Sequence, residues 1–535
     1  MDNTSPPNPI ELEVFRHLFA SVAEEMGERL MRSAYSPNIK ERRDFSCALF
    51  DANGEMLAQA AHIPVHLGST PMAVRAVIDG FALDRPGGPA SEAAYVLNDP
   101  YEGGTHLPDI TVVQPLVLPG SDRPAFYLAN RAHHADVGGI SPGSLPISKH
   151  IDEEGLRITP RILDDEAIDW IAAASRTPDE RRGDLQAQLA ALRVGVERLS
   201  SMTERYGLDV LTQRGGDLIA YTERIVRRLI SSLPDGVVEF EDLLDDDGQG
   251  ACDIVIHCVL RIEGDRASVD FTGSADQVAG PVNAVRAIVL SAVNYCFRCL
   301  LPADLPSNAG VMRPIEVLTR EGSVVDAQYP AAVAGGNVET SQRLVDVVFG
   351  ALAKVLPDRV PAASCGSMNN VTFGGSDVRN GGRPFAYYET LAGGVGASPD
   401  CAGADALHTH MTNTLNTPIE AFEHAYPVRI VQYSVRSGSG GMGKRDGGDG
   451  ITRAYQFDAP ATATLLTERR RSQPYGLDGA GSGEPGLNTL TDALGKTTEL
   501  PAKTSIEISK GQTLTIHTPG GGGHGHAEKI EEQST

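Results

Sequence analysis

The stretch NDPYEGGTHLPDITVV, residues 98–113, sets a glycine-rich turn directly before a run that is typical of a β-strand. Gly103, Gly104 and Pro108 favour the turn, and the run ITVV favours an extended chain. A second corner follows in YLANRAHHADVGG, residues 127–139, which again combines glycines with histidines and an aspartate. The polar residues of these two corners decide whether the chain is an enzyme.

The runs ITVVQPLVL and AFYLANRAH are expected to pair as antiparallel strands through a loop near LPGSDRP, with Leu118 roughly opposite Pro124. In an antiparallel pair, the residue numbers of any two opposed residues add up to the same total. The pair of Leu118 and Pro124 therefore places Asp109 opposite His133. Opposed side chains share one face of a sheet with their Cβ atoms about 5 Å apart, and His134 points to the other face. A slip of one residue would exchange the two histidines.

His106 and Asp109 lie three residues apart in the turn, and His133 faces Asp109 across the predicted hairpin. Together with Asp44, a candidate fourth ligand, they form a mixed nitrogen and oxygen set. Such a set suits zinc, manganese or iron better than calcium. The alternative that the spacing leaves open is a structural turn, in which Asp109 caps backbone amides and the histidines are hydrogen-bonded.

The composition excludes several classes of protein. The 535 residues carry 70 Asp and Glu against 46 Lys and Arg, a net charge of −24, which argues against a nucleic-acid partner. No apolar run is long enough to span a bilayer, and MDNTSPPNP lacks the features of a signal peptide. The seven cysteines are scattered and odd in number, which predicts free thiols. We therefore expect a cytoplasmic protein with no membrane contact.

The rest of the chain mixes helical and strand-like segments. Asn8 and Pro9 are typical of a helix start, DANG at 51–54 is typical of a hairpin turn, and 184–202 and 213–232 have helical periodicity. The first helix should bury an apolar stripe at intervals of four residues, Ile10, Val14, Leu18, Val22, Met26 and Leu30, which Phe15, Phe19 and Met31 widen. We predict an α+β fold, a large multi-layer globular subunit with mixed or antiparallel sheets and packed helices.

Five regions are expected along the chain. They are an N-terminal α/β region with the metal-site motifs (1–175), a helical segment (176–235), a second α/β region (236–360), a glycine-rich region with β-strands (361–518), and a flexible tail (519–535). His524 and His526 in the tail could hold a metal loosely, but a polar, glycine-rich terminus is more typical of a linker.

One motif suggests a nucleotide site and is rejected. Residues 438–444, GSGGMGK, match the GxxxxGK pattern of phosphate-binding loops. However, Arg445 stands where a Ser or Thr would hold magnesium, and RDGGDG is a poor start for the helix that such a loop needs. No other segment offers a binding site for ATP.

Two further polar sets are candidates for the lining of a substrate cavity. The first lies where a loop meets a helix, and its residues are Gly335, Gly336, Asn337, Glu339, Thr340 and Arg343. Its backbone amides could bind an anionic oxygen, or the set could be an ordinary helix cap. His408 and His410 have the spacing of one strand face and could ligate a second metal, although structural histidines are the more common case.

The chain resembles the hydantoinase B/oxoprolinase family, which includes a subunit of N-methylhydantoinase, the C-terminal part of 5-oxoprolinase and the large subunit of acetone carboxylase. The resemblance covers nearly the whole length and is carried by a series of motifs in one order: RDFSCALFD, NDPYEGGTHLPDI, RAHHADVGG, EGLRI, GPVNAV, GGNVETSQR, HTHMTNTLNTPIE, SGSGGMGKRDGGDGITR and TPGGGG. So many motifs in the same order make the resemblance specific.

The resemblance implies roles for particular residues. His106, Asp109 and His133 match the metal ligands of related members, and Asp44 matches an additional ligand in some of them. His134 and Asp136 are expected to orient His133 or the substrate. Asp44, His134 and Asp136 are thus the candidate catalytic residues, with Asp44 or Asp136 accepting a proton from water.

The resemblance also implies a function. It predicts a metal-dependent hydrolase subunit that attacks a lactam or imide ring after a hydantoinase A-type, ATP-using partner has activated it, so that the working enzyme is a hetero-oligomer. Two alternatives stay open: a subunit of an ATP-dependent ketone carboxylase, and a non-catalytic partner that only stabilises the ATPase subunit. The particular cyclic amide is not predictable from the residues.

Overall fold

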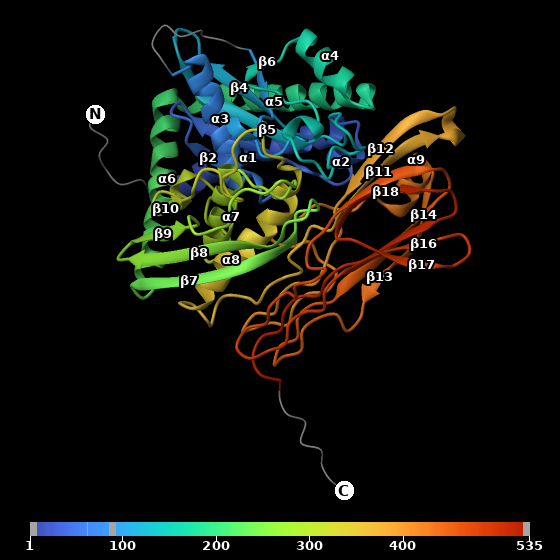
Figure 1. Ribbon diagram of the computed structural model, residues 1–535. Coiled ribbons are helices and arrows are strands. Elements are labelled where there is room, and N and C mark those ends of the chain that lie inside the picture. Colours follow the sequence, from blue (N-terminus) through green and yellow to red (C-terminus); the bar gives the residue numbers. More distant parts are fainter. Residues whose placement is uncertain (1–7, 61–62, 85–92, 528–535) are drawn as a thin grey trace.

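The computed structural model describes residues 8–60, 63–84 and 93–527. Within these residues the chain forms nine α-helices and four β-sheets, three of them antiparallel and one mixed, which confirms the predicted α+β class. Figure 1 shows the sheets of the C-terminal part, orange to red, beside a body built from the N-terminal and middle parts, blue to yellow. Among the described residues, no helix is long and apolar enough to cross a bilayer.

The first helix, α1 (Pro9–Ser33), begins where the sequence predicts. The side chain of Asn8 accepts a hydrogen bond from the backbone N–H of Ile10, and Pro9 occupies the first turn. The buried face includes Phe15, Phe19, Val22, Met26 and Leu30, whereas Ile10 and Val14 are exposed. The prediction is therefore wrong for Ile10 and Val14 and confirmed for Phe15 and Phe19, which take the buried positions in the first turns.

The N-terminal sheet has the strand order β2-β1-β5-β4-β3-β6. Its strands are β1 (Phe45–Asp51), β2 (Met56–Gln59), β3 (Tyr95–Leu97), β4 (Asp109–Val117), β5 (Pro124–His133) and β6 (Arg161–Ile162). β4 and β5 are antiparallel with Asp109 opposite His133, so the predicted register is confirmed; it holds to Leu116 and shifts at Val117. On its other side β5 pairs with β1, which follows Asp44.

Helices cover both faces of this sheet. Side chains of α3 (His66–Phe81) pack with Phe50, Val113 and Tyr127 on one face, and those of α1 and α5 pack with alternate strand residues on the other. The remaining helices of the first half are α2 (Pro37–Lys40), α4 (Asp165–Ala174), α5 (Pro178–Tyr206) and α6 (Leu208–Ser231). With both faces covered, the polar ends of β4 and β5 are buried as well.

A second sheet follows in the order β10-β9-β8-β7, with β9 and β10 parallel. Its strands are β7 (Gly236–Asp246), β8 (Cys252–Glu263), β9 (Arg266–Asp270) and β10 (Ile315–Leu318). α8 (Ser341–Ala353) packs on β7 and β8, and α7 (Arg286–Cys299) lies between α8 and α3. One hydrophobic core joins this sheet to the N-terminal part, so the first three predicted regions share a core.

The C-terminal part holds two antiparallel sheets with a core of their own. One has the order β12-β11-β15-β18, with β11 (Asn370–Asp377), β12 (Arg383–Glu389), β15 (Ala461–Leu466) and β18 (Lys503–Ile508). The other has the order β13-β14-β19-β16-β17, with β13 (Val428–Arg436), β14 (Gly450–Phe457), β16 (Leu487–Thr491), β17 (Thr497–Leu500) and β19 (Thr513–His517). The short helix α9 (Ile419–Ala425) packs against β13.

The glycine-rich segment at 519–525 is packed, so the flexible tail predicted for 519–535 is wrong over these residues; 528–535 lie outside the described residues. Gly441 N donates to Gly521 O, and Lys444 N donates to Gly525 O. The rejected phosphate-loop motif is therefore filled by backbone from the chain's own C-terminal segment. No helix follows Lys444 directly, in agreement with that rejection.

This packing predicts that Gly521 tolerates no side chain. An added Cβ would lie 2.2 Å from the carbonyl oxygen of Val395, far inside van der Waals contact. Gly521→Ala should lower the free energy of unfolding by about 1–3 kcal/mol or more, measured by denaturant or thermal unfolding. Gly216→Ala in α6 is the control, because its Cβ meets nothing within 4 Å. Equal melting of Gly521→Ala and the wild type would contradict this packing.

Candidate metal centre

Three side chains from the ends of β4 and β5 converge in the interior. Asp109 Oδ1 lies 3.1 Å from His106 Nε2 and 3.2 Å from His133 Nδ1. One ligand atom from each of the three residues lies within 4.8 Å of the others, and all three residues are at most 2% exposed. The predicted ligand candidates are thus brought together by the turn before β4 and by the pairing with β5.

The surroundings of these side chains fit a cation. His106 Nδ1 lies 3.4 Å from the carbonyl oxygen of Ala334, which leaves Nε2 to face Asp109. Fixing one ring nitrogen in this way is how proteins orient a histidine ligand. His133 Nε2 is buried without a hydrogen-bond partner. Two imidazoles and a carboxylate are a common donor set for zinc, manganese or iron.

The electrostatics of the cluster centre on Asp109. Burial by itself raises the pKa of this carboxyl, but His106, and then hydrogen bonds from His133 and His66, hold it well below its usual range. Burial lowers the pKa of His133 and of His66. Asp109 is therefore an anion surrounded by imidazoles. Of the two candidate histidine ligands, His133 favours the neutral form that metal binding requires, whereas, against the effect of burial, Asp109 raises the pKa of His106.

Four residues that the sequence did not assign to the metal also contact the cluster. Thr105 Oγ1 donates to Asp109 Oδ2 at 2.7 Å, and His66 Nε2 lies 3.5 Å from the same oxygen. The ring of Tyr388 stacks on His133 with 4.4 Å between centroids. Asn337 Nδ2 lies 3.1 Å from His106 Nε2, and Asn337 Oδ1 is buried without a partner.

The cluster borders a small cavity of about 20 Å³, room for about one water molecule or ion. Its lining mixes apolar side chains, Ile63, Val65, Val338, Met368 and Met411, with polar ones. The polar lining residues are Asp44, His66, Asp109, His133, Asn337, Tyr388, Thr390 and Thr412. A larger groove of about 780 Å³ lies between α3 and α7 and includes none of the three ligand candidates.

Asp44 lies beside the cluster. The backbone N–H of His133 donates to Asp44 O, the Asp44 side chain lines the cavity, and Arg42 Nη2 lies 3.9 Å from Asp44 Oδ2. Burial raises the pKa of the Asp44 carboxyl, against the opposing effects of His133 and Arg42. Asp44 does not belong to the group of three that converges on one point, so a fourth-ligand role stays a prediction.

His134 and Asp136 lie away from the cavity, which corrects the expected orienting roles. His134 Nε2 lies 3.0 Å from Gln188 Oε1 of α5, on the opposite face from His133, as strand alternation predicts. Both oxygens of Asp136 accept hydrogen bonds from its own loop, from Gly138 N and Gly143 N, and from Arg176. With its oxygens occupied, Asp136 fastens this loop and does not orient His133.

His408 and His410 do not lie on the one strand face that the sequence predicts. The segment around them is not a strand, and His410 has a positive φ of 55°. His410 lies near Asp346 and Tyr295, whereas His408 lies near Arg42 and Asn416. The expectation that both share one strand face is therefore wrong, because the segment turns between them.

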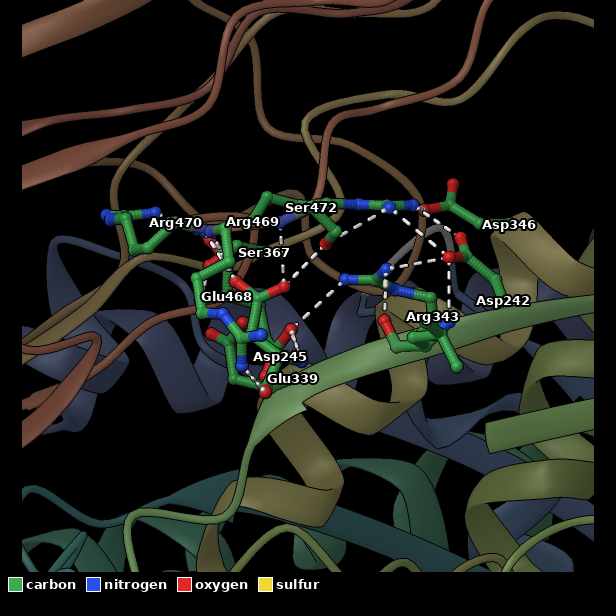
Figure 2. A network of polar contacts seen from close by, with 12 residues as sticks. Asp242, Asp245, Glu339, Arg343, Asp346, Ser367, Glu468, Arg469, Arg470 and Ser472 are labelled. Carbon is green, nitrogen blue, oxygen red and sulfur yellow. Dashed lines mark hydrogen bonds and ion pairs between the residues drawn. The ribbon is translucent and has the colours of Figure 1, made fainter. Parts of the chain in front are cut away.

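The segment that carries Asn337 is held by a buried charge network, drawn in Figure 2. Asn337 and Glu339 lie in a π-helical turn, Gly336–Thr340, that leads into α8. Arg343 of α8 contacts Asp242 of β7 at 3.3 Å and Glu468 of the C-terminal part at 3.2 Å. Arg469 contacts Asp242 at 2.6 Å and Asp346 at 3.0 Å. The network thus ties both halves of the chain to the turn beside the metal centre.

Comparison with known proteins agrees with this fold. Residues 8–527 match the family Hydantoinase B/oxoprolinase, and the chain belongs to that family. The chain is 39% identical to a 5-oxoprolinase of Dictyostelium discoideum over 98% of its own length but only 41% of that protein. It is 29% identical to a putative D-/L-hydantoinase subunit of a Pseudomonas strain, covering 98% of this chain and 91% of that one.

Solved structures show the same fold. An ATP-dependent caprolactamase from Pseudomonas jessenii superposes with a TM-score of 0.90 at 28% identity, covering 98% of this chain and 92% of that one. An acetone carboxylase superposes with a TM-score of 0.88 at 17% identity, covering 97% and 76%, and this likeness concerns the fold alone. The chain spans about two fifths of the length of the 5-oxoprolinases it matches.

The geometry predicts which substitutions empty the centre. The purified chain should hold about one divalent transition metal, and His106→Ala, Asp109→Ala and His133→Ala should each lose it, because each removes one of three ligands. His134→Ala is the matched control and should keep the metal, since its ring faces α5. Elemental analysis decides the matter, and metal loss from His134→Ala together with retention in His133→Ala would contradict the assignment.

The charge network predicts a dependence of stability on pH. Burial, with Glu468 second, raises the pKa of Glu339 from 4.5 to about 8. Between these values the folded state keeps a proton that the unfolded chain has released, so stability falls as the pH rises through this window, by about 1.4 kcal/mol per unit at most. Glu339→Gln, which mimics the protonated form, should reduce the difference in melting temperature between about pH 5 and about pH 8.

The control for this experiment is Glu499→Gln, which changes an exposed glutamate in β17. It should leave the pH dependence of melting as in the wild type. A Glu339→Gln variant with the full wild-type difference between the two pH values would mean that Glu339 ionises as readily in the folded as in the unfolded chain.

Proposed function

We propose that this chain is the metal-bearing hydrolytic subunit of an ATP-dependent enzyme that opens cyclic amides such as hydantoins or lactams. The observation that carries the proposal is the convergence of His106, Asp109 and His133 in the interior, beside a small cavity that Asp109 and His133 line. The names of the related proteins, a 5-oxoprolinase, a hydantoinase subunit and a caprolactamase, support cyclic amides as the substrate class. These names favour hydrolysis over ketone carboxylation.

A bound divalent cation would lower the pKa of water and polarise the amide carbonyl. The residues of the chain supply the rest. Asp44 lines the cavity beside His133 and is placed to accept a proton from attacking water or to complete the ligand set. Asn337 could present its unpartnered Oδ1 to the cation after rotation of its amide. The apolar wall of Val65, Met368 and Met411 limits the access of bulk water.

The closed cavity holds about one water molecule, so a substrate ring enters only after side chains withdraw. Met368 and Met411 are unbranched and have three rotatable side-chain bonds, which suits them to making room. Such an opening and closing around the substrate is common in enzymes that must exclude water from an activated intermediate.

We further propose that ATP is used by a hydantoinase A-type partner in a hetero-oligomer in the cytoplasm. Support comes from the phosphate-loop motif at 438–444, where the C-terminal glycines occupy the place a nucleotide would need. The subunit naming of the related hydantoinase and the ATP dependence of the related caprolactamase agree with this division of labour. The cysteines, scattered and seven in number, are consistent with a reducing compartment.

The test is ATP-dependent turnover by the chain purified together with such a partner, assayed against cyclic amides and, separately, ketones with bicarbonate. Ring-opened amide products are expected. Lys444→Ala should leave ATP use within a few-fold of wild type, whereas loss of a nucleotide-binding lysine usually costs orders of magnitude. Carboxylated products, or tight ATP binding by the isolated chain, would contradict the proposal.

A further inference from the structure

A row of polar side chains runs along one wall of the metal cavity. Arg42 Nη2 donates to Thr390 Oγ1 at 3.0 Å and to Thr414 Oγ1 at 3.4 Å. Thr390 Oγ1 lies 2.8 Å from Thr414 Oγ1, which lies 3.4 Å from Thr412 Oγ1. Thr390 and Thr412 line the cavity, and all four residues are at most 4% exposed. None of the four belongs to the candidate ligand set.

The chemistry of the row gives it a direction. A guanidinium donates hydrogen bonds and accepts none, so Thr390 accepts from Arg42 and is free to donate to Thr414. Thr414 can then donate to Thr412, which leaves the hydroxyl hydrogen of Thr412 for the cavity. The row therefore presents a donor, backed by a cation, to whatever lies in the cavity.

The balance of charge calls for an anion at this position. Arg42 is fully buried, its Nε has no partner, and its nearest charged neighbour is Asp44 at 3.9 Å. A divalent cation and Arg42 together would carry three positive charges against the two carboxylates of Asp44 and Asp109; Glu389, which also faces Arg42, is paired with Arg453. A buried charge without compensation is costly, so one negative charge would complete the loaded site.

We propose that Arg42, Thr390, Thr414 and Thr412 form a relay that binds an anionic oxygen of the substrate opposite the metal ligands. This inference rests on the proposed function and narrows its substrate class to a cyclic amide that carries an anion. The anion is either a carboxylate on the ring or the phosphate of an ATP-activated amide; both present the same acceptor oxygen. The ligand reaches Thr412 when the neighbouring Met411 withdraws.

The test is calorimetric binding to the full-length, metal-loaded chain. The probes are 5-oxoproline, 2-pyrrolidinone, which is the same ring without the carboxylate, and inorganic phosphate. The wild type should bind at least one of the two anions. Thr412→Val should weaken that binding about 10- to 100-fold, the usual effect of losing a hydrogen bond to a charged group, and should leave 2-pyrrolidinone unchanged.

Three variants separate the relay from general damage to the fold. Thr412→Ser keeps the hydroxyl and should bind as the wild type does. Thr414→Val breaks the relay away from the cavity wall and should cause a smaller loss in the same direction. Thr372→Val is the matched control, because Thr372 is equally buried and its hydroxyl has no partner in the structure; it should change nothing.

If Thr412→Val weakens the binding of 5-oxoproline, the anion that the relay binds is the carboxylate on the ring. If it weakens the binding of phosphate alone, the anion is the phosphate of the activated amide. Wild-type affinity of Thr412→Val for both anions, or an equal loss for all three probes, would overturn the relay. Metal content is measured on the same samples. A wild-type chain without metal would contradict the proposed function, whereas a metal-loaded chain whose anion affinity does not depend on Thr412 would contradict the relay alone.

Discussion

The register of β4 against β5 is the constraint on which the candidate site depends. Side chains alternate between the two faces of a strand, so a shift of one residue would turn His133 away from Asp109 and bring His134 toward it. The register is held from both sides, because β5 pairs with β4 along one edge and with β1 along the other. Helices bury both faces of the sheet, so a shift would also misplace every apolar side chain of β5.

The cavity beside this register is shared between distant parts of the chain. The N-terminal sheet supplies the ligand candidates, whereas Tyr388, Thr390 and Thr412 come from the C-terminal part. The charge network of Figure 2 crosses the same boundary and holds the turn that bears Asn337. Buried ion pairs contribute little net stability, but removal of one partner is strongly destabilising. The network therefore fixes how the two parts meet, and with it the shape of the cavity.

Local patterns in the sequence were enough to predict the parts of the site that depend on one hairpin. The turn glycines, the strand-like runs and the constant sum of paired residues placed Asp109 opposite His133 and separated His133 from His134. Residues that reach the site through tertiary packing gave no such signal. His66 starts a helix after β2, and Tyr388 and Thr412 lie more than 250 residues further along the chain, so no spacing rule connects them to the metal centre.

The predictions that the structure corrects failed for the same reason: they concern residues whose positions are set by tertiary packing. Asp136 looked like a site residue because it follows the histidine pair, but its loop turns away and uses its oxygens for backbone amides. The glycines at 519–525 looked like a tail, because composition does not reveal that their bare backbones pack closely against other glycine segments. His408 and His410 looked like one strand face until the backbone turned between them.

The most direct test of the central claim is a crystal structure of the metal-loaded chain with anomalous diffraction measured at the absorption edge of the bound metal. We expect a single strong peak within about 2.0–2.3 Å of His106 Nε2, Asp109 Oδ1 and His133 Nδ1. A peak elsewhere, or none at these three atoms in a chain that contains metal, would show that the hairpin register brings the three side chains together for a structural purpose and not for a metal.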